Sequence, residues 1–395
     1  MSDCSANTKP PRVLHVGKYF PPHPGGMETY LRDLMSVQHR NGLLVNAIAH
    51  SSKATLSDER IEVGALDGTT FTVHLVARWF TLGFAPISPM FALSAAKVVR
   101  AFCPDVLHIH LPNASLIWLS LFPIARRIPW VVHWHSDVLT PDSSRGTKIS
   151  YAFYRVFERW VLNRASVVLV TSLAYLQHSS VLKQYAKKCI VIPLGLDGAR
   201  LPDARQTPSL PHPEGPLICY VGRLAHYKGL TDLLTAINML PNASCWIAGE
   251  GEEQRSLIAL ISEYGLEDRV RLLGTVTEEQ KWAILNTADV VVLPSNQKTE
   301  AFGLVLLEAA HFGKPLVVRN IVGSGVPWVA AELGDSFCAT SQSADSLVVA
   351  IEQALIQVKL KTLSHRPRLP ASLNLEDQAR DILKQYEACF QRLAP

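Results

Sequence analysis

The chain has 395 residues, of which 48% are apolar and 18% are charged, and its formal net charge is +4. This length exceeds what one hydrophobic core usually holds, and the composition excludes an intrinsically disordered chain, so we expect two folded domains. Seven scattered cysteines include no C-x-x-C pair, which argues against a disulfide framework or a zinc site and favours a reducing cytosol.

Charge is distributed unevenly along the chain. Residues 1–200 hold 21 basic and 12 acidic side chains, whereas residues 201–395 hold 17 and 22. The excess of positive charge favours an anionic partner or surface for the first half only. A nucleic acid is not the expected partner, because the basic residues form no stripe with interleaved aromatic residues and no DNA- or RNA-binding motif occurs.

The first half alternates between strand and helix patterns. Helical patterns such as METYLRDLMSVQHR and YAFYRVFERWVLNRA separate runs that are apolar on both faces, which are typical of a parallel sheet with helices on both sides. The expected strands are RVLHV, LVNAIA, TFTVHLV, DVLHIH, WVVHWH, SVVLVTS and CIVIP.

A proline-rich, aperiodic segment over residues 201–216 is predicted to link this domain, residues 1–200, to a second one over residues 217–374. The second domain repeats the alternation, and its expected strands are LICYVG, CWIAGE, VRLLG, DVVVLPS and PLVVRN. The last segment, residues 375–395, is amphipathic, and we expect it to form a helix that packs back on the first domain. Two doubly wound domains would each bind ligands at the carboxyl ends of their strands.

Each domain opens with a turn that contains glycine. Gly25 and Gly26 precede the first helical pattern, where paired glycines let a backbone approach a bulky ligand. In CYVGRLAHYKGL of the second domain, Arg223 and Lys228 follow a strand and precede a helix. Two cations beside a helix N-terminus are suited to a diphosphate. The spacing in neither turn is G-x-G-x-x-G, which disfavours a dinucleotide cofactor.

Two glutamates lie on either side of the run AFGLVLL, at a later strand-to-helix turn of the second domain. Glu300 lies in the turn itself, and Glu308 lies about two turns into the helix. A lone glutamate at such a position is usually solvated. The pair becomes specific in combination with the two cations of the earlier loop.

The motifs GRLAHYKG, AGEGEE and EAFGLVLLE resemble, in order and spacing, the nucleotide-binding domain of family 4 retaining glycosyltransferases. The resemblance covers nearly the whole chain, because residues 12–35, 110–113 and 133–137 are similar to the N-terminal loops of bacterial surface-polysaccharide enzymes. It implies the α/β GT-B fold, in which two Rossmann-like domains face each other across a cleft. It also implies a hexosyltransferase.

The resemblance assigns a role to each matching residue on the donor side. Arg223 and Lys228 would bind the donor diphosphate, and Glu300 would face the donor sugar. Glu308 would accept hydrogen bonds from the ribose. Further donor contacts would come from the backbone of Phe302, Gly303 and Leu304, from Gly274 near the base, and from Gly25 and Gly26 of the first domain.

On the acceptor side, His135 matches the active-site histidine of the family. Asp137 and His110 are weaker candidates, and a histidine at an apolar strand end is otherwise often a core residue. The acceptor implied by the resemblance is a glycan or a polyprenol-linked sugar, in lipopolysaccharide or other cell-surface polysaccharide biosynthesis. The donor would be GDP- or UDP-linked, with GDP-mannose slightly favoured by the resemblance alone.

The chemistry expected for this family needs no cofactor and no metal. Negative charge grows on the diphosphate as the donor bond breaks, and preorganised cations stabilise that charge. No D-x-D sequence occurs in the chain, so we expect metal-independent transfer. The resemblance implies front-face attack by the acceptor hydroxyl, with the departing phosphate taking its proton.

We expect a cytoplasmic protein that is peripheral at the inner face of the cell membrane, since no signal peptide or membrane span is found. Basic residues lie beside large apolar ones in residues 77–102 and again in SLIWLSLFPIARR, and this combination favours an anionic membrane surface. A buried role is the alternative for the first segment and the favoured interpretation for the second. Three other functions stay open, namely a transferase with a small soluble acceptor, a non-catalytic sugar-nucleotide-binding protein and a nucleotide-linked oxidoreductase.

Overall fold

The computed structural model describes residues 9–65, 68–82, 85–120, 125–138, 145–360 and 369–391. The chain forms two compact units. The first comprises residues 1–170, 184–192 and 378–395, and the second comprises residues 171–183 and 193–377. Among the described residues, no helix combines the length and the apolar character that a bilayer-spanning segment needs.

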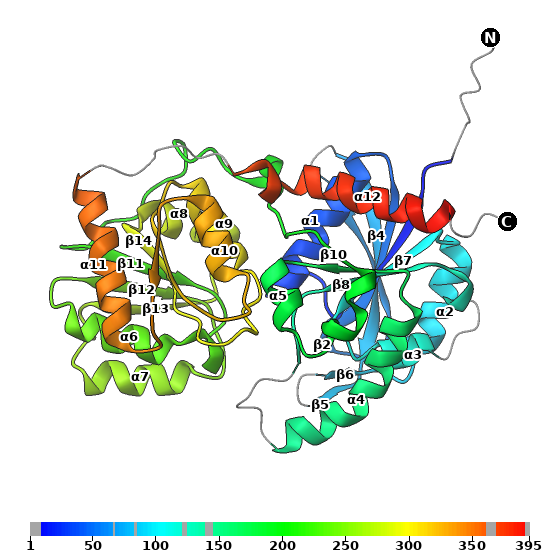
Figure 1. The fold of residues 1–395 in the computed structure, drawn as a ribbon, viewed down its shortest axis with the longest axis horizontal. Coiled ribbons are helices and arrows are strands. Elements are labelled where there is room, and N and C mark those ends of the chain that lie inside the picture. Colours follow the sequence, from blue (N-terminus) through cyan, green and yellow to red (C-terminus); the bar gives the residue numbers. More distant parts are fainter. Residues whose placement is uncertain are drawn as a thin grey trace, which may run out of the picture. The chain divides into compact units, whose positions relative to one another are not determined.

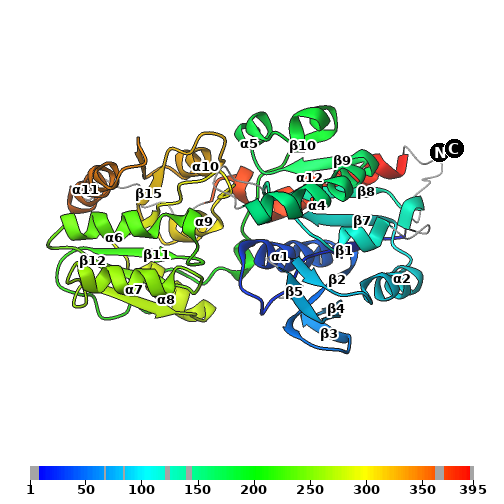
Figure 2. The same cartoon turned by 90° about the horizontal axis from the view of Figure 1, so that it is seen from below.

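The first unit is built on an eight-stranded sheet, and helices lie on both of its sides (Figures 1 and 2). The strand order is β10-β9-β8-β7-β1-β2-β4-β3, and all pairs are parallel except β3 with β4. The strands are β1 (Arg12–Val16), β2 (Leu44–Ala54), β3 (Glu59–Gly64), β4 (Thr70–Arg78), β7 (Val106–Leu111), β8 (Trp130–Trp134), β9 (Val167–Val170) and β10 (Cys189–Val191). A separate two-stranded ribbon is formed by β5 (Phe80–Leu82) and β6 (Ala85–Ile87).

The helices of the first unit come from both ends of the chain. α12 is the last helix of the sequence, yet most of it belongs to the first unit (Figure 1). Its Tyr386 is fully buried there and accepts a hydrogen bond from Gln38. The helices are α1 (Gly26–Arg40), α2 (Phe91–Phe102), α3 (Leu116–Ser120), α4 (Arg145–Arg164) and α12 (Leu375–Gln391).

The second unit has a six-stranded, fully parallel sheet in the order β13-β12-β11-β14-β15-β16. This is the order of a doubly wound dinucleotide-binding fold, with its topological switch point between β11 and β14. The strands are β11 (Leu217–Val221), β12 (Ser244–Ala248), β13 (Val270–Gly274), β14 (Val290–Leu293), β15 (Leu316–Arg319) and β16 (Ser336–Ala339). The helices are α5 (Leu173–His178), α6 (Leu230–Met239), α7 (Gln254–Glu263), α8 (Glu278–Thr287), α9 (Leu304–His311), α10 (Val326–Leu333) and α11 (Ala344–Leu360).

The proline-rich segment over residues 201–216 lies in the second unit and packs against it. The backbone N–H of Leu210 donates to the Thr287 hydroxyl (2.8 Å), and Asn286 donates to the carbonyl of Thr207 (2.7 Å). His212 and Asp289 approach each other to 3.0 Å. Side chains of the second unit therefore satisfy polar groups of this segment, although its sequence has no periodicity.

Candidate active site

The two loops at the switch point of the second unit are joined to each other. They follow β11 and β14 and cover residues 222–229 and 294–303. Gly229 has a φ of +68°, and a Cβ at this position would lie 2.3 Å from the carbonyl oxygen of Pro294. The N–H of Asn296 donates to the carbonyl of Tyr227 (2.9 Å). Because only glycine fits this contact, the sequence Lys228–Gly229 fixes the first loop against the second.

Lys228 and Glu300 form an ion pair between these two loops. The Lys228 ammonium donates to Oε2 of Glu300, and the Ser295 hydroxyl donates to the same oxygen (3.1 Å). Both charged side chains are about one-tenth exposed, at 11% and 12%. Burial opposes the charge on Lys228, but the neighbouring Glu300 carboxylate outweighs it, so the pKa of Lys228 is raised. The structure therefore brings two of the predicted donor-side residues together.

Arg223 lies in the same loop as Lys228 but is exposed. Its guanidinium carbon lies 5.8 Å from the centre of the Tyr227 ring, and the Lys228 ammonium lies 5.3 Å from the same ring. The Tyr220 hydroxyl donates to the carbonyl of Arg223 (2.8 Å) and so holds the loop backbone. The exposed guanidinium is open to solvent, while the lysine is paired.

The turn that contains Phe302, Gly303 and Leu304 has a fixed backbone. Gly303 precedes α9 with a φ of +77°, and a Cβ there would lie 2.7 Å from Cδ2 of Leu293. The Ser324 hydroxyl donates to the carbonyl of Glu300, and the N–H of Gly325 donates to the carbonyl of Ala301 (2.9 Å). These bonds hold the N-terminus of α9 in place, as a rigid anion or sugar site requires.

Glu308 is held by a second lysine. It lies on α9 and is 6% exposed, and its Oε1 accepts from the ammonium of Lys281 on α8 (2.6 Å). The Lys281 ammonium also lies 4.0 Å from the centre of the Trp282 ring. The two predicted glutamates thus each have their own lysine. We did not anticipate Lys281, because no motif connects it with a glutamate 27 residues further along.

Gly274 ends β13, and its neighbourhood belongs to the same edge of the sheet. The N–H of Gly249 donates to the carbonyl of Gly274 (2.8 Å), and the N–H of Leu224 donates to the carbonyl of Glu250 (2.9 Å). The loop that follows β12 therefore lies between the Arg223 loop and Gly274. Three of the motifs that we identified in the sequence are neighbours in the fold.

In the first unit, Gly25 and Gly26 are exposed at the N-terminus of α1. A Cβ on Gly25 would lie 2.1 Å from Oε2 of Glu28, a buried residue of the first helical turn. Glu28 and His110 both line a small cavity of about 10 Å³ beside the end of β1. Glycine at position 25 thus leaves room for the Glu28 carboxylate beside the turn.

His110, His135 and Asp137 lie at the carboxyl ends of β7 and β8, where a doubly wound fold binds ligands. All three are buried. His110 Nδ1 lies 3.0 Å from His135 Nε2, and Asp137 accepts a hydrogen bond from the Trp134 indole (3.2 Å). Burial lowers the pKa of His135 to about 3, so its ring is neutral at physiological pH.

Two features of this unit were not predicted. His15, His108 and His133 join His110 and His135 in one buried cluster, and two groups of three histidines have nitrogen atoms within 4.8 Å of one another. On α4, burial raises the pKa of Glu158 to about 7, and the Tyr151 hydroxyl donates to its Oε2 (2.7 Å). The alternation of residues along a strand indicates which histidines share a face of the sheet. No motif in the sequence indicates that Glu158 is buried or that its pKa is raised.

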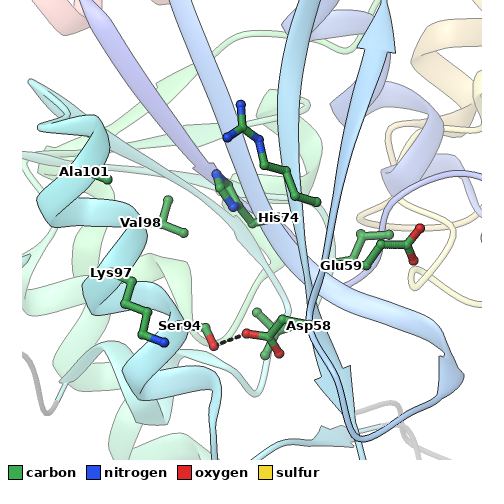
Figure 3. A pocket seen from close by; sticks show the side chains of 10 residues that line it. Asp58, Glu59, His74, Ser94, Lys97, Val98 and Ala101 are labelled. Atoms are coloured by element: carbon green, nitrogen blue, oxygen red, sulfur yellow. Dashed lines mark hydrogen bonds between the residues drawn. The ribbon is translucent and has the colours of Figure 1, made fainter.

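A larger pocket of about 250 Å³ lies elsewhere in the first unit, between α2 and the β3–β4 pair. Figure 3 shows Lys97 and Val98 of α2 on one side and Asp58 and His74 on the other, with Ser94 bonded to Asp58. None of its lining residues is a predicted site residue. The predicted site residues therefore lie outside this pocket.

An exposed stripe of α4 is apolar. Ile149, Phe153 and Val156 are 74%, 71% and 64% exposed and follow helical spacing, and Arg155 is exposed beside them. In the segment over residues 77–102, Trp79, Phe80, Met90 and Leu93 are also exposed. In the segment SLIWLSLFPIARR, for which the sequence favours a buried role, Ser115 and Leu119 belong to the core.

Comparison with known proteins agrees with this architecture. Residues 25–195 match the family described as Glycosyl transferase 4-like domain, and residues 204–364 match Glycosyl transferases group 1. The chain is 31% identical to the D-rhamnosyltransferase WbpZ of Pseudomonas aeruginosa over 80% of both chains. It is 29% identical to the O-antigen chain mannosyltransferase C of Escherichia coli, over 80% of this chain and 81% of that one. It is 30% identical to a glycogen synthase of Mycobacterium tuberculosis, over 87% and 86%.

Among solved structures, the sucrose-phosphate synthase of Thermosynechococcus elongatus superposes with a TM-score of 0.76 at 22% identity, over 97% of this chain and all of that one. The chain therefore belongs to the glycosyltransferase family whose two domains these matches define. It is a glycosyltransferase with the GT-B fold, as the sequence motifs predicted. This membership assigns the chain to the glycosyltransferases. It does not support the two other classes of protein considered above, an oxidoreductase and a non-catalytic binding protein.

Proposed function

We propose that this chain is a retaining hexosyltransferase. It moves a hexose from a nucleotide-sugar to a glycan or polyprenol-linked acceptor in cell-surface polysaccharide biosynthesis. The observation that carries the proposal is the largely buried Lys228–Glu300 pair at the switch point of the second unit, in the same loop region as the exposed Arg223. A paired carboxylate and ammonium next to a free guanidinium can bind sugar hydroxyls and phosphate oxygens together.

In this scheme, Arg223 and Lys228 bind the donor diphosphate, Glu300 binds the sugar and Glu308 binds the ribose. The bond between the anomeric carbon and the diphosphate breaks as the acceptor oxygen bonds to that carbon from the same face. The acceptor proton passes to an oxygen of the departing phosphate. Charge grows on the diphosphate during this step, and the two cations stabilise it without reorganising.

Metal-free transfer is part of the proposal. Glu300 and Glu308 are each paired with a lysine, Lys228 and Lys281, so the positive charge beside these carboxylates comes from side chains. The cations that the reaction needs are supplied by side chains. No cofactor takes part in the transfer.

For the acceptor, we assign His135 to the reacting sugar and place Asp137 beside the acceptor. The name of one relative, an O-antigen chain mannosyltransferase, supports a cell-surface polysaccharide as the acceptor. GDP-mannose is therefore the first donor to test, ahead of UDP-hexoses. A glucan acceptor is the second candidate, because a glycogen synthase is a relative of similar identity.

We further propose that the protein is cytoplasmic and binds peripherally to an anionic membrane. The exposed stripe of Ile149, Phe153 and Val156 on α4 supports this, since Lys148, Arg155 and Arg159 of the same helix are also exposed. Apolar side chains with flanking cations are suited to the interface of an anionic bilayer. A lipid-linked acceptor would be available at that surface.

The transfer assay uses radiolabelled GDP-mannose, UDP-glucose, UDP-galactose and ADP-glucose with bacterial lipid extracts, and separately with soluble glucans. We expect one donor to label a lipid-extractable product in the presence of the wild-type chain. Glu300→Gln should lose the labelling, while Glu263→Gln, which changes an exposed glutamate of α7, should keep it. Labelling of glucan alone would establish the second candidate, and no labelling with any donor would contradict both.

A further inference from the structure

Five buried histidines form a layer on one face of the first unit's sheet. His15 lies on β1, His108 and His110 lie on β7, and His133 and His135 lie in and directly after β8. They share a face because residues two apart in a strand point to the same side. The rings of His108 and His110 are stacked with centres 4.7 Å apart, and those of His133 and His135 are stacked at 4.6 Å. The rings do not only pack in the core, because nitrogen atoms of neighbouring rings are hydrogen-bonded to one another.

Two hydrogen-bonded branches run through this layer from Gln38 of α1. In the first, Gln38 Oε1 lies 2.8 Å from His15 Nε2, His15 Nδ1 lies 3.2 Å from His110 Nε2, and His110 Nδ1 lies 3.0 Å from His135 Nε2. This branch therefore connects a helix amide with the candidate active-site histidine.

The second branch leaves from the nitrogen of the same amide. Gln38 Nε2 donates to the Tyr386 hydroxyl (3.0 Å), which bonds to His108 Nδ1. His108 Nε2 lies 3.3 Å from His133 Nδ1. Both branches thus share one origin, and they end at different histidines.

All five rings are neutral at physiological pH. Burial lowers the pKa of His15 to about 4 and that of His135 to about 3, and it lowers the pKa of the other three well below the usual value. A neutral imidazole has one N–H and one bare nitrogen. Each bond between two rings therefore has a direction, and the direction of one bond sets that of the next.

The amide of Gln38 sets the direction of every bond. Its oxygen can only accept, so His15 carries its proton on Nε2 and accepts at Nδ1. His110 and then His135 must follow with the same tautomer, which leaves Nδ1 of His135 without a proton. In the second branch, the Tyr386 hydroxyl donates to His108, and His108 and His133 also carry their protons on Nε2. The opposite amide orientation would move all five protons to Nδ1.

The two branches together form a hydrogen-bonded relay, and the last ring nitrogen of each branch needs a partner. Among the described residues, Nδ1 of His135 and Nε2 of His133 are buried and have no hydrogen-bond partner. Buried polar atoms are normally satisfied by protein, water or ligand. A bare nitrogen at the end of the first branch can accept a hydrogen bond from a hydroxyl group and cannot donate one.

We propose that Gln38 is a positioning residue that fixes His135 in the Nε2–H tautomer through His15 and His110. Nδ1 of His135 then accepts a hydrogen bond from a hydroxyl of the reacting sugar. This inference rests on the proposed function, because it takes the sugar-facing role of His135 from there. Sugar hydroxyls both donate and accept, so the tautomer decides which hydroxyl orientation the site selects.

The test is long-range ¹H–¹⁵N NMR of ¹⁵N-histidine-labelled protein at pH 7.5, in which the two neutral tautomers have distinct nitrogen shifts. Signals are assigned with single histidine substitutions. We expect His135 and the other four buried rings in the Nε2–H form. Gln38→Met keeps the side-chain size and removes both bonds, so His15, His110 and His135 should become tautomer mixtures, and kcat/KM should fall about tenfold.

His108→Phe is the matched control, because it cuts the second branch beyond Tyr386 and leaves both hydrogen bonds of the Gln38 amide in place. His135 should stay in the Nε2–H form in this variant, and kcat/KM should stay within twofold of wild type. A wild-type His135 that carries its proton on Nδ1, or tautomers unchanged in Gln38→Met, would overturn the relay. So would a stoichiometric metal ion, measured by elemental analysis, that shifts the nitrogens of the cluster.

The NMR result does not depend on turnover, so its failure is distinct from failure of the proposed function. Mixed tautomers in Gln38→Met with an unchanged kcat/KM would overturn the positioning role and leave hexosyl transfer in place. An absence of transfer by the wild-type protein would contradict the proposed function instead, and with it the role of His135 toward a sugar.

Discussion

Lys228 and Glu300 are 72 residues apart in sequence, yet they form one ion pair between the loops that follow β11 and β14. Glycine at position 229 allows the backbones of the two loops to touch, and the ion pair links them through side chains. A ligand that binds either residue therefore contacts a side chain that is bonded to the other loop. The pair also has a consequence for stability, apart from any reaction.

Loss of the lysine should destabilise the second unit. Lys228→Ala leaves a largely buried carboxylate without its counter-ion, and breaking such a pair costs about 3 kcal/mol. Urea unfolding should show this loss in the free energy of unfolding. Lys228→Met combined with Glu300→Leu should recover part of it, because the uncompensated charge is then absent. Equal stabilities of Lys228→Ala and of the exposed control Arg255→Ala would show that the pair is not structural.

The two glutamates should separate in kinetics. Glu308→Gln is expected to raise the donor KM chiefly, because the ribose is bound alike in the ground and transition states. Glu300→Gln is expected to lower kcat, because the sugar changes charge and shape during transfer. Steady-state kinetics with folding checked by circular dichroism decides this. A Glu300→Gln enzyme with normal kcat and a raised KM would show that its assigned role is wrong.

The histidine layer should make the protein sensitive to mild acid. Its five pKa values lie below those of the unfolded chain, so below about pH 6.5 the unfolded state binds protons that the native state cannot. The free energy of unfolding then falls as the pH falls, by up to about 1.4 kcal/mol per pH unit for each histidine.

Urea unfolding at pH 8.0, 6.5, 6.0 and 5.5 measures this dependence above the range in which ordinary carboxylates titrate. We expect little change from pH 8.0 to 6.5 and a steep loss below. Substitution of exposed His178 by Gln should leave the slope unchanged. A flat profile down to pH 5.5 would mean that the layer takes up protons without unfolding.

Membrane binding should depend on α4. The wild-type protein should sediment with anionic liposomes at low salt and be released at high salt, because charge attraction is screened. Substitution of Ile149, Phe153 and Val156 by Ser should reduce binding at least tenfold. The same change at exposed apolar residues of the second unit, such as Ile258 and Val349, is the control. Binding that is equal on neutral vesicles, or unaffected by the α4 changes, would exclude this surface.

The strands of both sheets were largely predictable, because short apolar runs rich in β-branched residues and bounded by turn residues are typical of buried strands. The exceptions are short or polar. β3 (ERIEVG) lies at a sheet edge with alternate residues exposed, and β16 (SFCA) has four residues, so neither has the apolar run of a central strand. The loop cations and the glutamates could be predicted because the motifs GRLAHYKG and EAFGLVLLE occur in the order and spacing typical of the family.

The partners of these residues could not be found in the same way. Lys281 meets Glu308 only through the packing of α8 against α9, and Gln38 and Tyr386 meet 348 residues apart. The sequence shows which histidines share a strand face, but it does not show which ring nitrogens bond to one another. Pairings of this kind depend on the register of neighbouring strands and on which helix covers them.

Calorimetric titration of the wild-type chain with GDP, UDP, ADP and dTDP in EDTA tests the donor site most directly. We predict that one nucleoside diphosphate binds without metal. Its Kd should weaken at least tenfold in Arg223→Ala, whereas Arg255→Ala should bind as the wild type does. Binding that requires Mn²⁺ or Mg²⁺, or that is unchanged in Arg223→Ala, would contradict a diphosphate site built from the cations of the β11 loop.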